Sequence, residues 1–118
     1  MEERRSVARW RLDQEASLIL DNGAMPISCV VEDLSTNGMR LSMGKNVFPE
    51  LFSSFSLALG TDFSLKLGAN VAWHDAADTK NIYGLSFNEV NDTLKEAIVQ
   101  YVKDHFPSEM AKHWWKGA

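Results

Sequence analysis

The chain is poor in cysteine, in long apolar runs and in positive charge, and each shortage excludes a class of protein. Cys29 is the single cysteine, so an internal disulfide is impossible. We expect a small buried side chain there, in a protein of the reducing cytoplasm. No run approaches the roughly 20 apolar residues that a membrane-spanning helix needs, and the charged N-terminus lacks the apolar segment of a signal peptide. We therefore predict no membrane insertion.

Positive charge is scarce overall but concentrated at one end. Twelve Lys and Arg residues face sixteen Asp and Glu, which gives a net charge of −4, yet four arginines stand within the first eleven residues. A general nucleic-acid binder needs a broad basic face, so we expect no nucleic acid polymer as a partner. An acidic domain with a basic arm suits a small, compact anion instead. With 118 residues, 45% of them hydrophobic, the chain is long enough for one globular domain.

Sequence motifs for catalysis and metal binding are missing as well. There is no G-x-x-x-x-G-K-[ST] phosphate loop and no nucleophile elbow. His74, His105 and His113 stand far apart in the sequence, and one cysteine cannot complete a metal-ligand set with them. We therefore expect no metal and no cofactor, and an enzyme is the least supported function class.

Alternation of apolar and polar residues predicts six β-strands. Residues 44–54, which include Pro49, are expected to form a loop or a short helical turn, and residues 75–80 a polar loop. Gly68 suggests a bulge or bend inside the fifth strand. The predicted strands are residues 16–20, 27–31 with a continuation into the following hexapeptide, 39–43, 55–59, 63–73 and 83–87.

After the sixth strand the apolar period changes to that of a helix. Asn91 can cap this helix, and Thr93 with Glu96 can form a capping box. Pro107 marks the end of the helix or lies just past it. The apolar stripe consists of Leu94, Ala97, Ile98, Tyr101 and Val102.

Six antiparallel strands and one helix suit a small barrel with a helical lid, because closure removes the exposed sheet edges. We expect a flexible basic arm at 1–11, the barrel and helix at 12–106, and a Trp-rich tail at 107–118 that is either irregular or a second short helix. Trp114 and Trp115 either cover apolar barrel surface or form a partner-binding patch, since tryptophan is frequent in interface hot spots.

Two short motifs carry the functional signal. Arg5 and Arg9 fit the pattern R-x-x-x-R, with Arg4 just before them. Arginine presents a planar fork of donors that suits phosphate oxygens and the acceptor edge of guanine. The competing interpretation is a solvated, disordered terminus, as most charged termini are.

The second motif is the hexapeptide Asp33-Leu34-Ser35-Thr36-Asn37-Gly38, which fits D-x-S-x-x-G and lies at a predicted hairpin tip. An ionised Asp33 suits the N–H groups of guanine, and Ser35 offers a hydroxyl. Gly38 allows close approach of the backbone to a ligand, or a positive φ. A polar hairpin tip alone explains Asn37-Gly38 well, but it does not explain the accompanying arginine motif.

Both motifs, in this order and ahead of a run of strands, resemble the PilZ domain, the bacterial receptor module for cyclic di-GMP. The resemblance extends over residues 3–105 and includes Val71-x-Trp73 and Tyr83-Gly84-Leu85-x-Phe87. It implies a mainly β fold, a six-stranded antiparallel β-barrel with a C-terminal α-helix. Trp73 is either a barrel-wall or core residue, or an aromatic platform for a guanine ring. The residues implied in cyclic di-GMP binding are Arg4, Arg5, Arg9, Asp33, Ser35, Asn37, Gly38 and Trp73.

The resulting hypothesis is a non-enzymatic receptor whose arm becomes ordered over cyclic di-GMP and thereby signals to a protein partner that the sequence does not identify. The alternative is a PilZ-fold interaction module that binds no nucleotide, although this chain has kept both motifs. Because it begins directly on the arginine motif and ends abruptly, the chain is either a whole protein or an excised domain.

Overall fold

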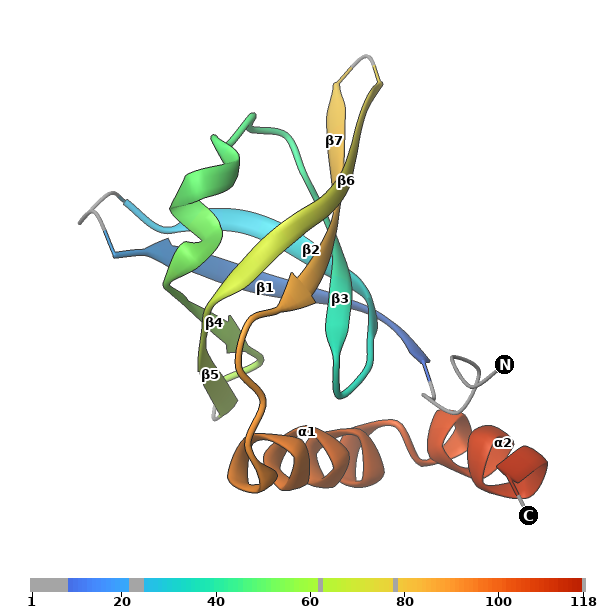
Figure 1. Cartoon of the computed structure of the whole chain (residues 1–118). Helices are drawn as coiled ribbons and strands as arrows, with labels where there is room; N and C mark the ends of the chain where they lie inside the picture. The colour runs from blue at the N-terminus through green and yellow to red at the C-terminus, as the bar shows by residue number, and fades with distance from the viewer. Residues whose placement is uncertain (1–8, 22–24, 62, 78, 118) are drawn as a thin grey trace.

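The structure, a computed structural model, describes residues 9–21, 25–61, 63–77 and 79–117, with side chains up to residue 112. Its described part contains one antiparallel sheet and two α-helices (Figure 1). The strands are β1 Trp10–Leu20, β2 Ile27–Leu34, β3 Gly38–Met43, β4 Phe55–Leu59, β5 Phe63–Leu67, β6 Ala69–Ala77 and β7 Lys80–Phe87; the helices are the 3₁₀ turn η2 Pro49–Ser53, α1 Asp92–His105 and α2 Pro107–Gly117.

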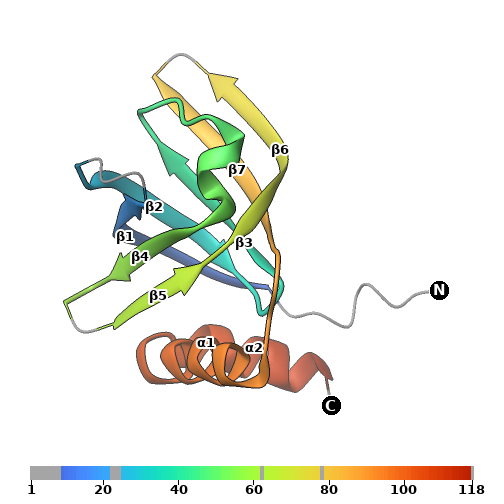
Figure 2. The same cartoon turned by 60° about the vertical axis from the view of Figure 1, so that its left-hand side comes forward.

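The sheet has the strand order β5-β4-β1-β2-β3-β7-β6. Its two end strands, β5 and β6, follow one another in the sequence with only Gly68 between them. The sheet is therefore rolled up until its two ends approach at this residue, but the ladder of described strands is not closed into a barrel (Figures 1 and 2). The mainly β fold with a C-terminal helix is confirmed.

Gly68 explains why the single strand expected over residues 63–73 is two strands. A Cβ atom at this position would lie 2.4 Å from the carbonyl oxygen of Ser53, so only glycine fits the corner. The chain leaves its pairing with β4 there and begins to pair with β7. The strand continues to Ala77, so the polar loop expected from residue 75 is shorter than predicted.

Inward-facing apolar side chains of the sheet form the core. Phe52, on η2, enters this core and contacts the rings of Phe55 and Tyr83 at centroid distances of 5.7 and 5.3 Å. Burying a side chain of this size stabilises the fold by about 1.5–3 kcal/mol. The Tyr83 hydroxyl is satisfied because it accepts a hydrogen bond from the backbone N–H of Val47 at 2.7 Å.

Helix α1 covers one end of the rolled sheet, as predicted for a lid (Figure 2). Its buried stripe includes Ile98, Tyr101 and Val102, and the ring of Tyr101 stacks on Phe63 of β5 at 4.4 Å. This stacking fixes the helix to the sheet.

The predicted cap of α1 is confirmed, but the predicted capping box is not formed. The side chain of Asn91 accepts a hydrogen bond from the N–H of Leu94 at 2.8 Å. Because Asn91 is the N-cap, Thr93 lies inside the first turn and cannot cap it. Pro107 lies just past the helix and starts α2, so the segment expected as a tail or a short helix is helical through residue 117.

Strand β1 is longer than predicted and includes the last two residues of the expected arm. Trp10 and Leu12 are buried in the core, so they belong to the strand. Asp13 has a φ of +50°, and the pairing with β2 shifts register between Arg11 and Gln14. This irregular, polar stretch hides the alternation in the sequence.

The remaining predictions for the termini lie outside the described residues. Arg4 and Arg5 belong to residues 1–8, and the side chains of Trp114 and Trp115 are likewise not described. No helix in the described ranges is long and apolar enough to cross a membrane.

Candidate functional site

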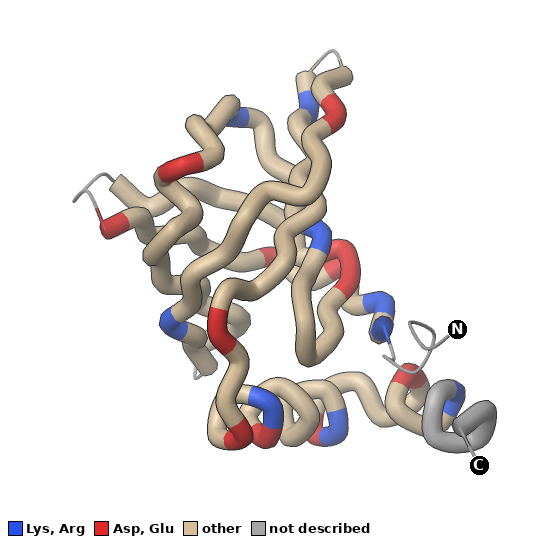
Figure 3. Tube along the Cα trace, in the orientation of Figure 1, with Lys and Arg blue, Asp and Glu red and all other residues tan. Residues whose placement is uncertain are grey.

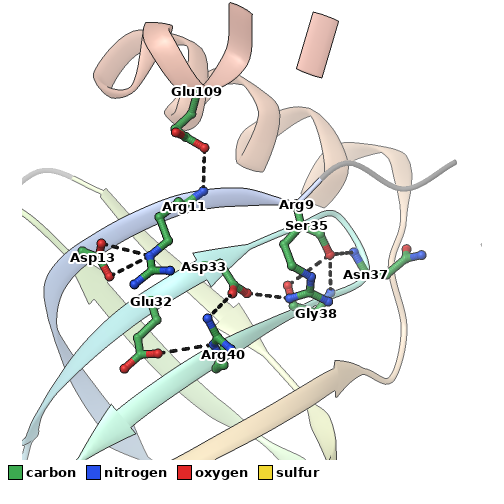
Figure 4. Close-up of polar contacts among 10 residues, drawn as sticks. All are labelled: Arg9, Arg11, Asp13, Glu32, Asp33, Ser35, Asn37, Gly38, Arg40 and Glu109. Carbon is green, nitrogen blue, oxygen red and sulfur yellow. Dashed lines mark hydrogen bonds and ion pairs between the residues drawn. The ribbon is translucent and has the colours of Figure 1, made fainter. Parts of the chain in front are cut away.

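Strand register aligns the candidate residues in one row across five strands. Residues that pair directly on neighbouring antiparallel strands point to the same face of a sheet. Successive pairs join β1, β2, β3, β7 and β6 in the row Arg11–Asp33–Arg40–Gly84–Trp73. The adjacent row points inward and is formed by Trp10, Leu34, Met39, Leu85 and Val71. The candidate site therefore lies on the outer face of the sheet (Figure 4).

Asp33, the second residue of this row, is the centre of a cluster of charged side chains. Arg9 donates from Nη1 to Asp33 Oδ1 at 2.5 Å, and Arg40 Nη2 lies 3.1 Å from Oδ2 (Figure 4). The Asp33 side chain is only 9% exposed, whereas that of Arg9 is 54% exposed. A buried carboxylate needs such partners, because removing it from water unpaired is unfavourable. The sequence-predicted residues Arg9 and Asp33 are thus brought into direct contact.

A β-bulge places a second carboxylate beside the first. The β2–β3 pairing shifts register between Val31 and Asp33, which leaves Glu32 as the extra residue. Glu32 lies 3.3 Å from Arg40 Nε through one oxygen and 3.7 Å from Lys80 Nζ through the other. Bulges commonly redirect side chains in this way. Acidic and basic segments consequently adjoin where β1, β2 and β3 meet (Figure 3).

Arg11 pairs with Asp33 across the strands, but its side chain makes hydrogen bonds with Asp13. Its Nε donates to both oxygens of Asp13, at 3.1 and 3.0 Å, and this hydrogen-bonded ion pair raises the pKa of Arg11. The left-handed backbone of Asp13, which aspartate tolerates better than most residues, accompanies the bulge in β1. The backbone N–H of Arg11 donates to Glu109 of α2 at 2.9 Å, which connects the helix to the start of β1.

Ser35 shapes the β2–β3 turn with all of its hydrogen-bonding capacity. Its hydroxyl accepts from the N–H groups of Asn37 and Gly38, both at 3.1 Å, and donates to the carbonyl of Gly38 at 3.2 Å. A hydroxyl has one donor and two acceptor positions, so none is left over. Ser35 is buried, whereas Asn37 is exposed at the tip of the turn.

The close approach expected of Gly38 is made to the protein's own backbone. A Cβ atom on Gly38 would lie 2.2 Å from the carbonyl oxygen of Leu85 on β7. The positive φ considered from sequence is found instead at Gly60 among the described glycines. Gly38 is therefore required for β3 and β7 to pair beside the turn.

Trp73 lies on the outer face and is 46% exposed, so it is not a core residue. A Cβ atom on Gly84 would fall 2.2 Å from Trp73 Nε1 and 2.3 Å from Cε2, which shows that the indole lies against the bare backbone of this glycine. Gly84 pairs with Arg40 on its other side. The row thus ends in a partly exposed aromatic ring next to the charged cluster.

The sequence interpretation missed Arg40, Glu32 and Lys80. A usable signal existed for Arg40, which occupies an outward position of the predicted strand over residues 39–43, two residues after Gly38. Glu32 could not be placed, because a bulge cannot be read from alternation alone. Three cations and two carboxylates, counting Arg9 and Asp33, make a site suited to a small anion that also carries hydrogen-bond donors.

No group of three or more His, Cys, Asp or Glu residues within the described ranges could hold a metal ion. A cavity of about 830 Å³ lies towards the other end of the same strands and is lined by small and polar residues that include Ser28, Cys29 and Ser42. Burial raises the pKa of Cys29 to about 11, so the thiol is poorly reactive, and the predicted buried position of this residue is confirmed.

Comparison with known proteins identifies a family and several similar folds. The family model described as PilZ domain matches residues 3–104. The structure of YcgR in complex with c-di-GMP from Escherichia coli has a TM-score of 0.66 at 16% identity, covering 98% of this chain and 51% of that one. The K. pneumonia MrkH–c-di-GMP complex has a TM-score of 0.69 at 16% identity, covering 95% and 57%.

Bacillus subtilis MotI, an inhibitor of motility, has a TM-score of 0.59 at 16% identity, covering 85% of this chain and 49% of that one. The chain therefore spans about half the length of these proteins. At such identities the likeness shows the fold. No curated protein matches the chain.

Proposed function

This chain belongs to the PilZ domain family, and we propose that it is a non-enzymatic cytoplasmic receptor for cyclic di-GMP that signals to a protein partner. The observation that carries the proposal is the outer face of the sheet, where Asp33 makes ion pairs with Arg9 and Arg40 and the row of paired residues ends at Trp73. The ligand has two phosphates and two guanines, and the row offers groups that suit each part.

Guanine presents donors and acceptors on different edges, and both kinds have partners here. Its N–H groups suit the acceptor-only carboxylate of Asp33, whereas O6 and N7 suit an arginine fork. The exposed indole of Trp73 offers a flat surface for a base, and base–aromatic stacking contributes about 1–3 kcal/mol. The phosphates of the ligand would then be bound by Arg9, Arg4 and Arg5.

Binding requires the ion pair of Arg9 and Asp33 to open, because it occupies groups that the nucleotide would use. We expect the arm to exchange this internal contact for contacts with the ligand, which changes the surface at the start of β1. Helix α2 contacts that same place through Glu109. A protein partner would therefore bind differently after rearrangement of the arm, of α2, or of both.

Two structures with a similar fold support the choice of ligand. YcgR and MrkH were each solved in complex with c-di-GMP. These proteins share their fold with this chain, and we propose that the chain binds the same ligand.

An interaction module without nucleotide is the second candidate, and one observation favours it. Ser35 and Gly38, two residues of the D-x-S-x-x-G motif, are already satisfied by the turn and by β7, so a fold that binds no ligand would need them too. A fold that binds no ligand would not need the ion pair of Arg9 and Asp33 on the outer face of the sheet, whereas a receptor would.

Isothermal titration calorimetry with cyclic di-GMP, with linear GMP as comparator, separates the two candidates. A receptor binds cyclic di-GMP far more tightly than GMP. Asp33→Ala and Trp73→Ala should weaken binding roughly tenfold or more, whereas Lys95→Ala, an exposed change on α1, should not. If folded wild-type protein gives no binding heat, the receptor function is excluded and the interaction module is the better description.

A further inference from the structure

We propose that Arg40 is a positioning residue of the nucleotide site, which fixes Asp33 so that one carboxylate oxygen is free to exchange Arg9 for guanine. This inference rests on the proposed function. Arg40 matches neither the R-x-x-x-R nor the D-x-S-x-x-G pattern. It is assigned here from its place in the sheet and from the two carboxylates that it contacts.

The two oxygens of Asp33 are divided between two arginines of different kinds. Oδ2 lies 3.1 Å from Nη2 of Arg40, and Oδ1 accepts from Nη1 of Arg9 at 2.5 Å. Each oxygen therefore has its own partner, so one contact can be exchanged while the other is kept.

Arg40 is anchored, whereas Arg9 is not. Arg40 belongs to β3, which is paired on both sides, with Asp33 on β2 and with Gly84 on β7. Its side chain is 34% exposed. Arg9 precedes the first residue of β1, and its side chain is 54% exposed. The exchangeable contact is therefore that of Arg9 with Oδ1.

The guanidinium of Arg40 also bridges two neighbouring carboxylates. Its Nε lies 3.3 Å from Glu32, as an ion pair without hydrogen-bond geometry, and its Nη2 lies 3.1 Å from Asp33, an arrangement that the bulge in β2 makes possible. A planar fork can hold two carboxylates in one plane, which a single ammonium group cannot do. Arg40 thus restricts the rotation of the Asp33 carboxylate and keeps one cation on it after Arg9 leaves.

The consequence for recognition is specific. A carboxylate held by Oδ2 presents Oδ1 in one direction, where it can accept from the N–H groups of a guanine edge. Arg40 contacts Oδ2, whereas the guanine would contact Oδ1. Replacing Arg40 should therefore change binding only indirectly, by changing the position of the Asp33 carboxylate. A direct contact between Arg40 and a ligand phosphate would instead act independently of the base.

Ligands that differ only in the base distinguish these two roles. Cyclic di-IMP has the phosphates of cyclic di-GMP but lacks the exocyclic amino group of guanine. Affinities for both are measured by calorimetry on wild type, Arg40→Gln, Asp33→Asn and the double variant. We expect Arg40→Gln to lose about tenfold or more for cyclic di-GMP, less for cyclic di-IMP, and little further once Asp33 is Asn.

Lys66→Gln is the matched control, because Lys66 on β5 makes an ion pair with Asp21 at 2.9 Å and lies outside the row of candidate residues. It should keep both affinity and base preference. Thermal unfolding checks that each variant is folded. If Arg40→Gln does not fold, Arg40→Lys replaces it, and loss of base preference is again expected since one ammonium group cannot span both carboxylates.

Equal losses for both ligands, with additive effects of Arg40→Gln and Asp33→Asn, would overturn the positioning role in favour of a phosphate contact. Unchanged affinity and preference in Arg40→Gln would overturn any role for Arg40, while wild-type binding would leave the receptor function standing. Absence of binding by folded wild-type protein would overturn both.

Discussion

Replacing Gly38 by alanine should force β3 and β7 apart. The added Cβ would lie 2.2 Å from the carbonyl oxygen of Leu85, whereas carbon–oxygen contacts in sheets are about 3.3 Å or longer. The strands are therefore about 1 Å too close for any side chain here. Both strands are paired on two sides, and the obstructing atom is backbone, so no side-chain rotation can relieve the clash.

The expected loss of stability follows from this overlap. Overpacking typically costs about 1–3 kcal/mol, and each weakened ladder hydrogen bond adds about 0.5–1.5 kcal/mol. We expect Gly38→Ala to lower the free energy of unfolding by about 2–4 kcal/mol. For a domain of this length, that corresponds to a fall in Tm of roughly 8–16 °C.

Urea or thermal unfolding of wild type, Gly38→Ala and Gly44→Ala measures the effect. Gly44 is the matched control, because the nearest atom to its added Cβ is the Thr79 carbonyl oxygen at an ordinary 3.8 Å. Its replacement should change stability by less than about 1 kcal/mol. If Gly38→Ala is as stable as Gly44→Ala but binds cyclic di-GMP more weakly, the glycine serves the ligand and our explanation from strand contact is refuted.

Three further predictions concern the turn, the arm and the core. Ser35→Ala should lower the free energy of unfolding by about 1–3 kcal/mol, because backbone groups of the turn lose the hydroxyl with which they form hydrogen bonds. The exposed change Ser64→Ala should not, and equal unfolding curves for the two variants would contradict the role of Ser35. Arg9→Ala should keep the fold but weaken cyclic di-GMP binding roughly 10–150-fold, and the affinity of the wild type should fall with added salt. If calorimetry gives Arg9→Ala the same affinity as the control Lys95→Ala, Arg9 is not part of the site. Burial raises the pKa of Cys29 from an ordinary 9.0 to about 11, so the unfolded chain loses this proton first and the free energy of unfolding should decline between these pH values. Chemical unfolding of Cys29→Ala should show a smaller decline, and pH profiles that run parallel for the variant and the wild type would contradict this explanation.

Local patterns in the sequence were enough to predict the class of fold and the family. Strict alternation over residues 55–59 predicted β4 with its observed bounds, and the stripe at Ile98, Tyr101 and Val102 predicted the lid helix. Such local patterns are readable because side-chain period depends only on the local backbone conformation. The paired arginine and D-x-S-x-x-G motifs predicted the PilZ fold, which the structure and the family match confirm.

Which residues share the site could be learned only from the way the strands pair. Arg40 meets Asp33 because of β2–β3 register. Trp73 joins the same row through Gly84, and the pairing of Gly84 with Arg40 connects residues far apart in the sequence. The tertiary structure also decided that Ser35 and Gly38 serve the turn and the neighbouring strand. The physical reason is the same in each case: the partner that satisfies a charge, or the atom that excludes a Cβ, comes from another strand, and a local pattern contains no information about which strand that is.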